Sequence, residues 1–284
     1  MIPAAFDYKA PTSVDEALQL LAEGGDDAKI IAGGQSLLPV MKLRLAAPEL
    51  LIDLAKIDSL KGVRDDGDAI VIGAMTPHFE VVGDPLVAEH ASLIARCVET
   101  VADPQVRHRG TIGGACAHAD PAGDLPAPMV ALDAEFVIAG PDGHRRVVAA
   151  DFFQDLFTTA LGEDEILVEV RVPKYTGWGS AYEKFVRVAQ QWAIAGVAAT
   201  VRTDGGTIAE ARLALTNMGP TPVRARAAEQ ALAGVAVEPD AVAGALANIV
   251  DGTAPPTDLN GDPEYRRHLA LILGRRAVLA AART

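Results

Sequence analysis

Cysteine, aromatic residues and clustered positive charge are all scarce in this chain of 284 residues. The two cysteines, Cys97 and Cys116, are too few for a disulfide framework, an iron–sulfur cluster or a four-thiolate zinc site. Acidic residues outnumber basic ones, 38 to 25, and no block of Lys and Arg is present. Because sequence-independent binding to phosphate needs such a block, nucleic acid is not expected as a partner.

Long apolar runs are missing as well. No stretch approaches the ~20 residues that a membrane span needs. The N-terminus lacks the basic segment and apolar core of a signal peptide. Half of the residues are nonetheless apolar, so the chain can bury a sizeable core. These features predict a cytoplasmic protein, with peripheral membrane association through a complex left open.

Short apolar runs and helical spacing alternate through the first half of the chain. Thr12 or Ser13 can cap a helix that Gly24 and Gly25 end. The spacing of apolar residues predicts one further, continuous helix over 85–101. Five runs have the length and composition of buried strands: 29–32, 50–54, 69–73, 135–139 and 165–170.

The composition shifts at 173–179, which predicts a boundary between two domains. Beyond it the patterns predict strands at 181–187, 193–203 and 209–216, followed by helices at 224–232, 239–249 and 263–281. Strands followed by helices favour an α+β fold for this part. Four arginines of the last helix are interpreted as a solvated face or a contact for an acidic partner subunit: Arg266, Arg267, Arg275 and Arg276.

Two glycine pairs carry the strongest chemical signal. Gly33-Gly34 follows an apolar strand and precedes Ser36, while Gly113-Gly114 follows Thr111. Glycine lets main-chain N–H groups crowd around an anion without a Cβ in the way, so two converging loops can hold a pyrophosphate. Each pair alone is typical of a tight turn. Neither has the dinucleotide-binding Gly-x-Gly-x-x-Gly pattern, and no Gly-Lys-Ser/Thr phosphate loop is present.

Four segments in a fixed order make the pattern specific: Ala32–Pro39, Gly73–Thr76, Arg109–Gly114 and Asp120–Ala127. Together they resemble the FAD-binding medium subunit of the molybdenum hydroxylases, the group that contains aerobic carbon monoxide dehydrogenase and xanthine dehydrogenase. The resemblance implies an α+β protein with a two-part FAD-binding domain over residues 1–175, its subdomains at about 1–56 and 57–175. An α+β C-terminal domain, like that of the carbon monoxide dehydrogenase flavoprotein, is expected over residues 178–284.

The resemblance also implies how FAD is bound. Both glycine loops hold the pyrophosphate through backbone amides and hydroxyls, and Asp124 accepts from ribose or ribityl hydroxyls. Lys184 matches a position near the flavin, and Trp192 stands where relatives place an aromatic ring beside the isoalloxazine. The expected cofactor-binding residues are Ala32, Gly33, Gly34, Gln35, Ser36, Leu37, Thr76, Ala102, Thr111, Ile112, Gly113, Gly114, Asp124, Val168, Lys184 and Trp192. No catalytic residue and no metal ligand is expected.

The function implied by the resemblance is electron transfer through FAD. Iron–sulfur clusters of a small partner subunit deliver the electrons, a molybdopterin-containing large subunit oxidises the substrate, and an external acceptor receives the electrons. Carbon monoxide is the expected substrate, while nicotine, quinoline, caffeine or aldehyde hydroxylases remain open. Two further alternatives are a self-sufficient flavin oxidoreductase and a non-enzymatic binding protein in which both glycine pairs are plain turns.

The histidines and Cys116 allow other interpretations. Since no pair of histidines has metal-ligand spacing, they are interpreted as loop or solvent residues, with a flavin contact by His118 left open: His78, His90, His108 and His118. Cys97 is interpreted as a small core residue. Cys116 is interpreted as a small spacer in a crowded loop, with redox activity or covalent flavin attachment as the alternative.

Overall fold

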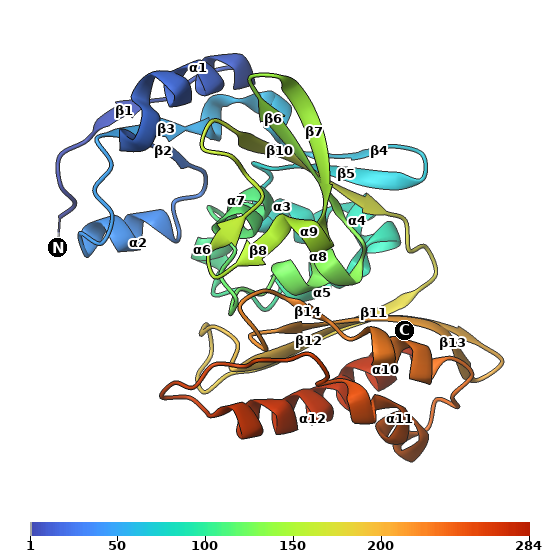
Figure 1. Ribbon diagram of the computed structural model, residues 1–284. Helices are drawn as coiled ribbons and strands as arrows, with labels where there is room; N and C mark the ends of the chain where they lie inside the picture. Colours follow the sequence, from blue (N-terminus) through green and yellow to red (C-terminus); the bar gives the residue numbers. More distant parts are fainter. Residues whose placement is uncertain (1) are drawn as a thin grey trace.

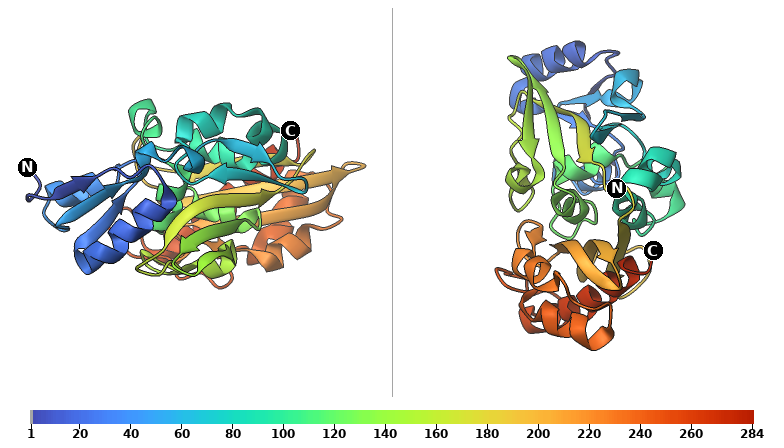
Figure 2. Two further views of the ribbon diagram at one scale, coloured as in Figure 1. Left: turned by 90° about the horizontal axis from the view of Figure 1, so that it is seen from above. Right: turned by 90° about the vertical axis from the view of Figure 1, so that its right-hand side faces the viewer.

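The computed structural model describes residues 2–284 and has two parts joined by a short linker (Figure 1). The N-terminal part runs to Tyr175, and the C-terminal part begins at Gly179. Two further views show that the two parts lie against one another along a broad face (Figure 2). Within residues 2–284 no helix combines the length and the apolar character that a bilayer crossing requires.

A small lobe at one end of the N-terminal part is built around three parallel strands. The strand order is β1 (Asp7–Lys9), β3 (Leu50–Asp53), β2 (Ala28–Ile31). Helix α1 (Val14–Gly24) packs on them, and Ser13 caps it by accepting the N–H of Glu16 at 3.2 Å. The lobe also contains α2 (Leu37–Lys42) and the short 3₁₀ turns η1 (Gly25–Asp27), η2 (Leu54–Lys56) and η3 (Asp58–Leu60).

The rest of the N-terminal part is an antiparallel sheet with short helices. Its strand order is β4 (Val63–Asp65), β5 (Ala69–Gly73), β10 (Ile166–Pro173), β6 (Glu135–Gly140), β7 (Gly143–Val148). Two short strands, β8 (Phe153–Asp155) and β9 (Thr158–Thr159), form a separate hairpin. The helices are α3 (His78–Gly83), α4 (Pro85–His90), α5 (Ser92–Val98), α6 (Pro104–Arg107), α7 (Ile112–His118), α8 (Pro126–Ala131) and α9 (Ala149–Phe152).

The continuous helix predicted over 85–101 is wrong. The chain leaves the helical conformation at Ala91, with φ −145° and ψ 43°, and forms α4 and α5 instead. The N–H of Ala91 still donates to Val87 O at 2.9 Å, so the break ends α4 without losing that bond. Apolar spacing survives such a break because both short helices turn the same kind of face toward the core.

The C-terminal part is a four-stranded antiparallel sheet buried on both faces. The strand order is β11 (Gly179–Phe185), β12 (Ala195–Asp204), β13 (Thr207–Thr216), β14 (Val223–Arg224). Helices cover one face: α10 (Arg226–Leu232), α11 (Pro239–Ala245), the 3₁₀ turn η4 (Leu246–Asn248) and α12 (Pro263–Ala281). Val197 and Val201 of β12 face these helices, whereas Ala198 belongs to the core of the N-terminal part. On that second face Ala198 and Ala214 pack, with Tyr182, in the same core as residues of α5 and α8.

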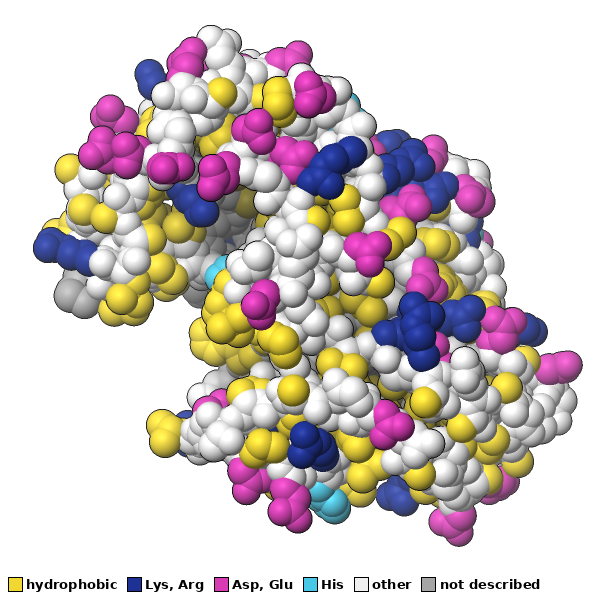
Figure 3. Space-filling model, viewed as in Figure 1, with side chains coloured by type: hydrophobic (Ala, Val, Ile, Leu, Met, Phe, Trp, Pro, Cys, Tyr) yellow, Lys and Arg dark blue, Asp and Glu magenta, His cyan; other side chains and the backbone are white. Residues whose placement is uncertain are grey.

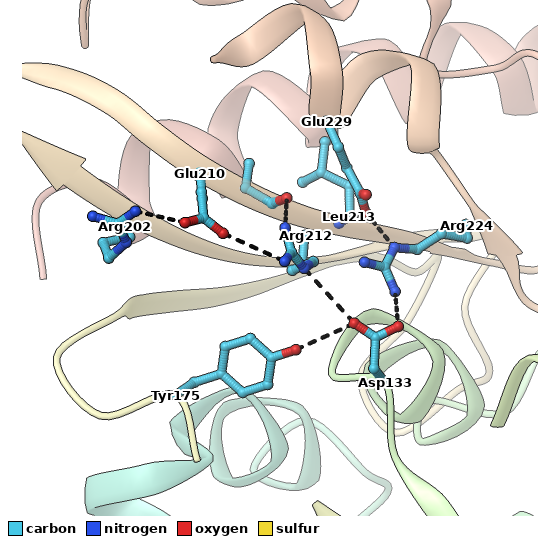
Figure 4. A network of polar contacts seen from close by, with 9 residues as sticks. Asp133, Tyr175, Arg202, Glu210, Arg212, Leu213, Arg224 and Glu229 are labelled. Carbon is cyan, nitrogen blue, oxygen red and sulfur yellow. Dashed lines mark hydrogen bonds and ion pairs between the residues drawn. The ribbon is translucent and has the colours of Figure 1, made fainter. Parts of the chain in front are cut away.

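A polar network joins the two parts on one side of the junction (Figure 4). Asp133, after α8, accepts from Arg224 of β14 at 2.9 Å and from the Tyr175 hydroxyl at 3.4 Å, and it pairs with Arg212 at 3.7 Å. Arg224 also pairs with Glu229 of α10. The network thereby joins the linker at Tyr175, the end of α8 and the C-terminal sheet.

The interpretation of Arg266 as part of a solvated face is wrong. Its side chain is fully buried, pairs with Asp258 at 2.6 Å, and donates to Ile194 O. The helix α12 has the predicted bounds, but its N-terminal turn points this arginine under the sheet rather than into solvent.

Candidate functional site

The first glycine pair lies in the connection between β2 and α2. Gly34 has φ +72°, a left-handed conformation that glycine adopts without strain. The backbone N–H groups of Gly33, Gly34, Gln35 and Ser36 donate to no acceptor within residues 2–284. Successive free N–H groups in such a turn form a concavity that binds anions. The first loop therefore has the donors that a pyrophosphate needs.

The second glycine pair is the first turn of a helix rather than a free loop. Thr111 caps α7 and its hydroxyl oxygen accepts the N–H of Gly114 at 3.1 Å. The N–H of Gly113 donates to Ala74 O at 2.9 Å, and that of Ile112 to Thr76 O at 3.1 Å. Since these three amides already have acceptors, the second loop can offer an anion only the backbone N–H and the side-chain hydroxyl hydrogen of Thr111.

The two loops converge, and glycine is what allows it. A Cβ on Gly33 would lie 2.1 Å from the carbonyl oxygen of Arg109, just before the second loop. A Cβ on Gly114 would lie 3.2 Å from the Cβ of Ala32. The second loop and the residues just before it thus pack directly against the first loop. On this side the molecule is hollowed between the lobe and the rest of the N-terminal part, where the β2–α2 connection lies (Figure 3).

A second cavity opens at the junction of the two parts. This cleft has a volume of about 580 Å³ and is lined by α6 and its preceding turn, by the end of β11, and by the loop that follows β11. Two of the expected cofactor residues lie in its wall, Lys184 and Ala102, the latter with φ +40°. Trp192 is on the same loop and is 68% exposed, so its ring is available for stacking.

Asp124 is buried in a network that crosses the junction. One carboxylate oxygen pairs with the Lys184 ammonium at 2.8 Å, and the other accepts from the Tyr182 hydroxyl at 2.9 Å. Burial raises the pKa of Asp124, and Lys184 acts in the opposite direction. Burial likewise raises the pKa of Tyr182. Both carboxylate oxygens of Asp124 thus have protein partners. Contact with a sugar hydroxyl stays a prediction, and it would use the second lone pair of one of these oxygens.

Three other expected residues are enclosed by protein. Val168 is 4% exposed and packs in the apolar cluster between the lobe and the sheet. Ile112 is fully buried. The Thr76 hydroxyl is buried and bonds to Gly62 and to Gly73 O at 2.7 Å. Any contact of these three with a cofactor stays a prediction.

Leu37, the remaining member of the first loop, begins α2 and is partly buried.

The remaining candidates show no reactive environment. Burial raises the pKa of the Cys116 thiol, which disfavours the thiolate and favours the spacer interpretation. His118 packs against Phe157 with ring centroids 5.2 Å apart. Burial lowers the pKa of His78 to about 4, so this histidine is neutral. Within residues 2–284, no three His, Cys, Asp or Glu side chains are grouped closely enough to hold a metal ion.

Two residues of the junction were not anticipated from the sequence, Tyr182 and Asn217. Tyr182 stands two positions before Lys184 in β11, and the period of a strand puts both side chains on one face, so its place was available from the sequence. Asn217 follows β13 and carries no such signal. Its backbone conformation and partners become visible only in the fold.

Known proteins match both parts of this chain. The family described as the FAD binding domain in molybdopterin dehydrogenase matches residues 4–175, and the family described as the CO dehydrogenase flavoprotein C-terminal domain matches residues 180–281. The carbon monoxide dehydrogenase medium chain of Hydrogenophaga pseudoflava is 45% identical over 284 residues, with 99% of this chain and 98% of that protein covered.

Two solved structures share the whole architecture. The carbon monoxide dehydrogenase of Hydrogenophaga pseudoflava that lacks the Mo-pyranopterin moiety matches with a TM-score of 0.95 and 48% identity, covering 99% of this chain and 98% of that one. Quinoline 2-oxidoreductase from Pseudomonas putida 86 also matches with a TM-score of 0.95, at 35% identity and over 100% and 99% of the two chains.

Proposed function

Since the chain belongs to the FAD-binding medium subunits of the molybdenum hydroxylases, we propose that it serves as the electron-transfer flavoprotein subunit of an aerobic carbon monoxide dehydrogenase. The membership confirms the α+β fold class and the family predicted from the four sequence segments. The chain is a subunit of an oxidoreductase whose molybdenum and iron–sulfur centres belong to other subunits. The whole-length identity to a carbon monoxide dehydrogenase medium chain carries the choice of substrate.

The first glycine loop fits the pyrophosphate of FAD. Its four free backbone N–H groups are neutral donors that stabilise an anion without burying a counter-charge. Ser36 and Thr111 add hydroxyls on either side. A Cβ on Gly33 would collide with Arg109 just before the second loop, and a Cβ on Gly114 would make a tight contact with Ala32 of the first, so the two glycines keep this group of donors compact.

The junction cleft fits the flavin end of the cofactor. Lys184 presents a buried ammonium in the cleft wall, and Trp192 offers a flat exposed ring. A fixed cation beside a flavin favours electron density on the ring, and tuning of this kind is the protein's part in cofactor chemistry. FAD supplies the acceptance and release of electrons, while Asp124 and Tyr182 hold Lys184 in place.

The partners we propose are a large molybdenum-containing subunit, a small iron–sulfur subunit and an external electron acceptor. This chain has only two cysteines, both buried, so the clusters must be carried elsewhere. Electron entry and exit thus both occur at the surface of this subunit.

The first experiment is the visible absorption spectrum of the purified chain with added FAD, followed by chromatography of the cofactor that heat releases. We expect a flavin spectrum and released FAD. The complex purified from the native cells should then contain three subunits and reduce a dye with carbon monoxide. A chain that stays colourless with FAD and with its partner subunits contradicts the proposal.

A medium subunit of an N-heterocycle hydroxylase is the second candidate. The observation that favours it is the match to quinoline 2-oxidoreductase, which equals the match to carbon monoxide dehydrogenase in TM-score. Substrate is oxidised on the large subunit in both cases, so the same native complex is assayed with quinoline and nicotine. Oxidation of either one, without oxidation of carbon monoxide, selects this candidate.

A further inference from the structure

Two segments from opposite sides of the junction meet at one buried residue, Asn217, one bound by its backbone and the other by its side chain. This residue follows β13 and is 8% exposed. Its backbone N–H donates to Pro121 O at 2.9 Å, in the N-terminal part. Its side-chain amide donates to Ala193 O at 2.7 Å and lies 3.4 Å from Ile194 O, at the start of β12. One residue thus bonds to both segments.

The first of these segments leads to the buried ion pair. It turns tightly, because Asp120 accepts the N–H of Ala122 at 2.9 Å and that of Gly123 at 2.8 Å. It ends at Asp124, which pairs with Lys184. A shift of this segment moves the carboxylate that holds the Lys184 ammonium in the cleft wall.

The second segment is the loop 186–194 between β11 and β12, which we call the cleft loop. Its ends are joined by the N–H of Ile194, which donates to Phe185 O at 2.8 Å. Its middle lines the junction cleft, and it carries Trp192. Arg266 also donates to Ile194 O, so the C-terminal end of the cleft loop is held by two buried donors.

The backbone of Asn217 shows why asparagine is used here. Its φ of +59° lies in the left-handed region, which asparagine tolerates better than most side chains and glycine tolerates best. Glycine would therefore relieve the backbone at no steric cost. What asparagine adds is the side-chain amide, whose two N–H groups face carbonyl oxygens of the cleft loop.

We propose that Asn217 is a positioning residue that fixes the cleft loop against the segment 120–124 and so sets how the junction binds FAD. The inference rests on the proposed function, because it concerns the same cofactor. The side chain acts through Trp192 and Lys184 rather than by touching the flavin. Its neutral amide suits this place, since a carboxylate would face the two carbonyl oxygens without a hydrogen to donate.

The test compares Asn217→Gly and Asn217→Asp with the wild-type full chain and with Asn248→Gly, a matched change at an exposed asparagine of η4. The measurements are the FAD dissociation constant, the visible circular dichroism of bound FAD, and the Tm of the FAD-free chain. We expect both Asn217 variants to bind FAD about tenfold more weakly, equivalent to about 1.4 kcal/mol, with an altered dichroism. Asn248→Gly should match the wild type in both cofactor measurements.

A lower Tm with unchanged FAD affinity and unchanged dichroism would show that Asn217 only stabilises the fold, and it would overturn the inference. If Asn217→Gly does not fold, Asn217→Asp decides, because it keeps the size of the side chain and tolerates the same φ. Failure of the proposed function is recognised separately, since then the wild-type chain itself binds no FAD.

Discussion

The two glycine pairs look alike in the sequence but differ in backbone conformation and hydrogen bonding in the structure. Around Gly33-Gly34 the backbone N–H groups are free, and the chain takes a left-handed turn. Around Gly113-Gly114 the N–H groups are bonded within the protein, and the chain is already helical. The first pair exposes donors, whereas the second removes side chains so that α7 can pack on Ala74 and on the first loop.

The difference shows that a double glycine can serve a ligand or serve packing. Backbone hydrogen bonds distinguish the two roles. Each backbone amide has one hydrogen, so an amide that already donates inside the protein is not available to an anion. We therefore propose that the first loop binds the anion and that the second loop supports the first.

The largest effect is expected from Gly113→Ala. A Cβ there would lie 2.4 Å from the Cβ of Ala74 and 2.7 Å from its carbonyl oxygen, inside the core. We expect the free energy of unfolding of the FAD-free chain to fall by about 3 kcal/mol, as overpacking of a rigid site does. This should occur although alanine has the higher helix propensity. Chemical denaturation of the FAD-free chain measures it.

Gly244→Ala is the matched control, since Gly244 also lies in a helix, α11, and a Cβ there meets nothing within 4 Å. Helix propensity alone should then raise stability by about 1 kcal/mol. If both substitutions stabilise the chain, close packing at Gly113 does not require glycine. The proposed difference between the two loops is then wrong.

A smaller effect is expected from acid, through His78 beneath the second loop. Its backbone N–H donates to Gly110 O at 2.9 Å, and burial lowers the pKa of its ring to about 4 from an ordinary 6.5. Below pH 6.5 the unfolded chain binds a proton that the folded chain does not, so this stability is present above that pH and is lost as pH falls toward 4. Between pH 7 and pH 5 the loss amounts to about 2 kcal/mol.

Urea unfolding of the wild type and of His78→Leu at the two pH values measures this loss. Other groups titrate in both chains and cancel in the difference. Leucine sacrifices no hydrogen bond at Nδ1, which has no partner within residues 2–284. Equal losses in the two chains would mean that His78 is not held neutral under the second loop.

Regular elements with a clear apolar pattern were predictable from the sequence. The strand Ala69–Gly73 and the helix Pro263–Ala281 have the predicted bounds. The strand Gly143–Val148 was not predicted, because it is an exposed edge strand with little apolar patterning to reveal it. The break at Ala91 was missed for the opposite reason, since apolar spacing continues across it.

The site was predictable in part because its signal is local. A glycine pair after a strand and a hydroxyl beside it can be seen in one segment, and the structure brings those segments together. Which backbone N–H groups remain free cannot be predicted from one segment. The acceptors for the N–H groups of Ile112 and Gly113 come from the residues after β5. Asn217 is hidden for the same reason, because its partners Pro121 and Ala193 are far from it in the sequence.

The smallest effect is expected at the first loop, from Gln35→Glu. The residue is exposed, so the change adds one negative charge beside the four free N–H groups without crowding them. Two like charges about 4 Å apart repel by about 1 kcal/mol in water, so FAD should bind about fivefold more weakly. Half-molar salt should restore part of the affinity by screening.

The control is Gln230→Glu, at an exposed position of α10. It adds the same charge far from the loop and should leave the FAD dissociation constant unchanged. Because Gln35→Glu alters charge but not packing, stability should stay as in the wild type, in contrast to Gly113→Ala. An unchanged affinity for FAD at low salt would place the pyrophosphate away from the first loop and reverse the roles assigned to the two glycine pairs.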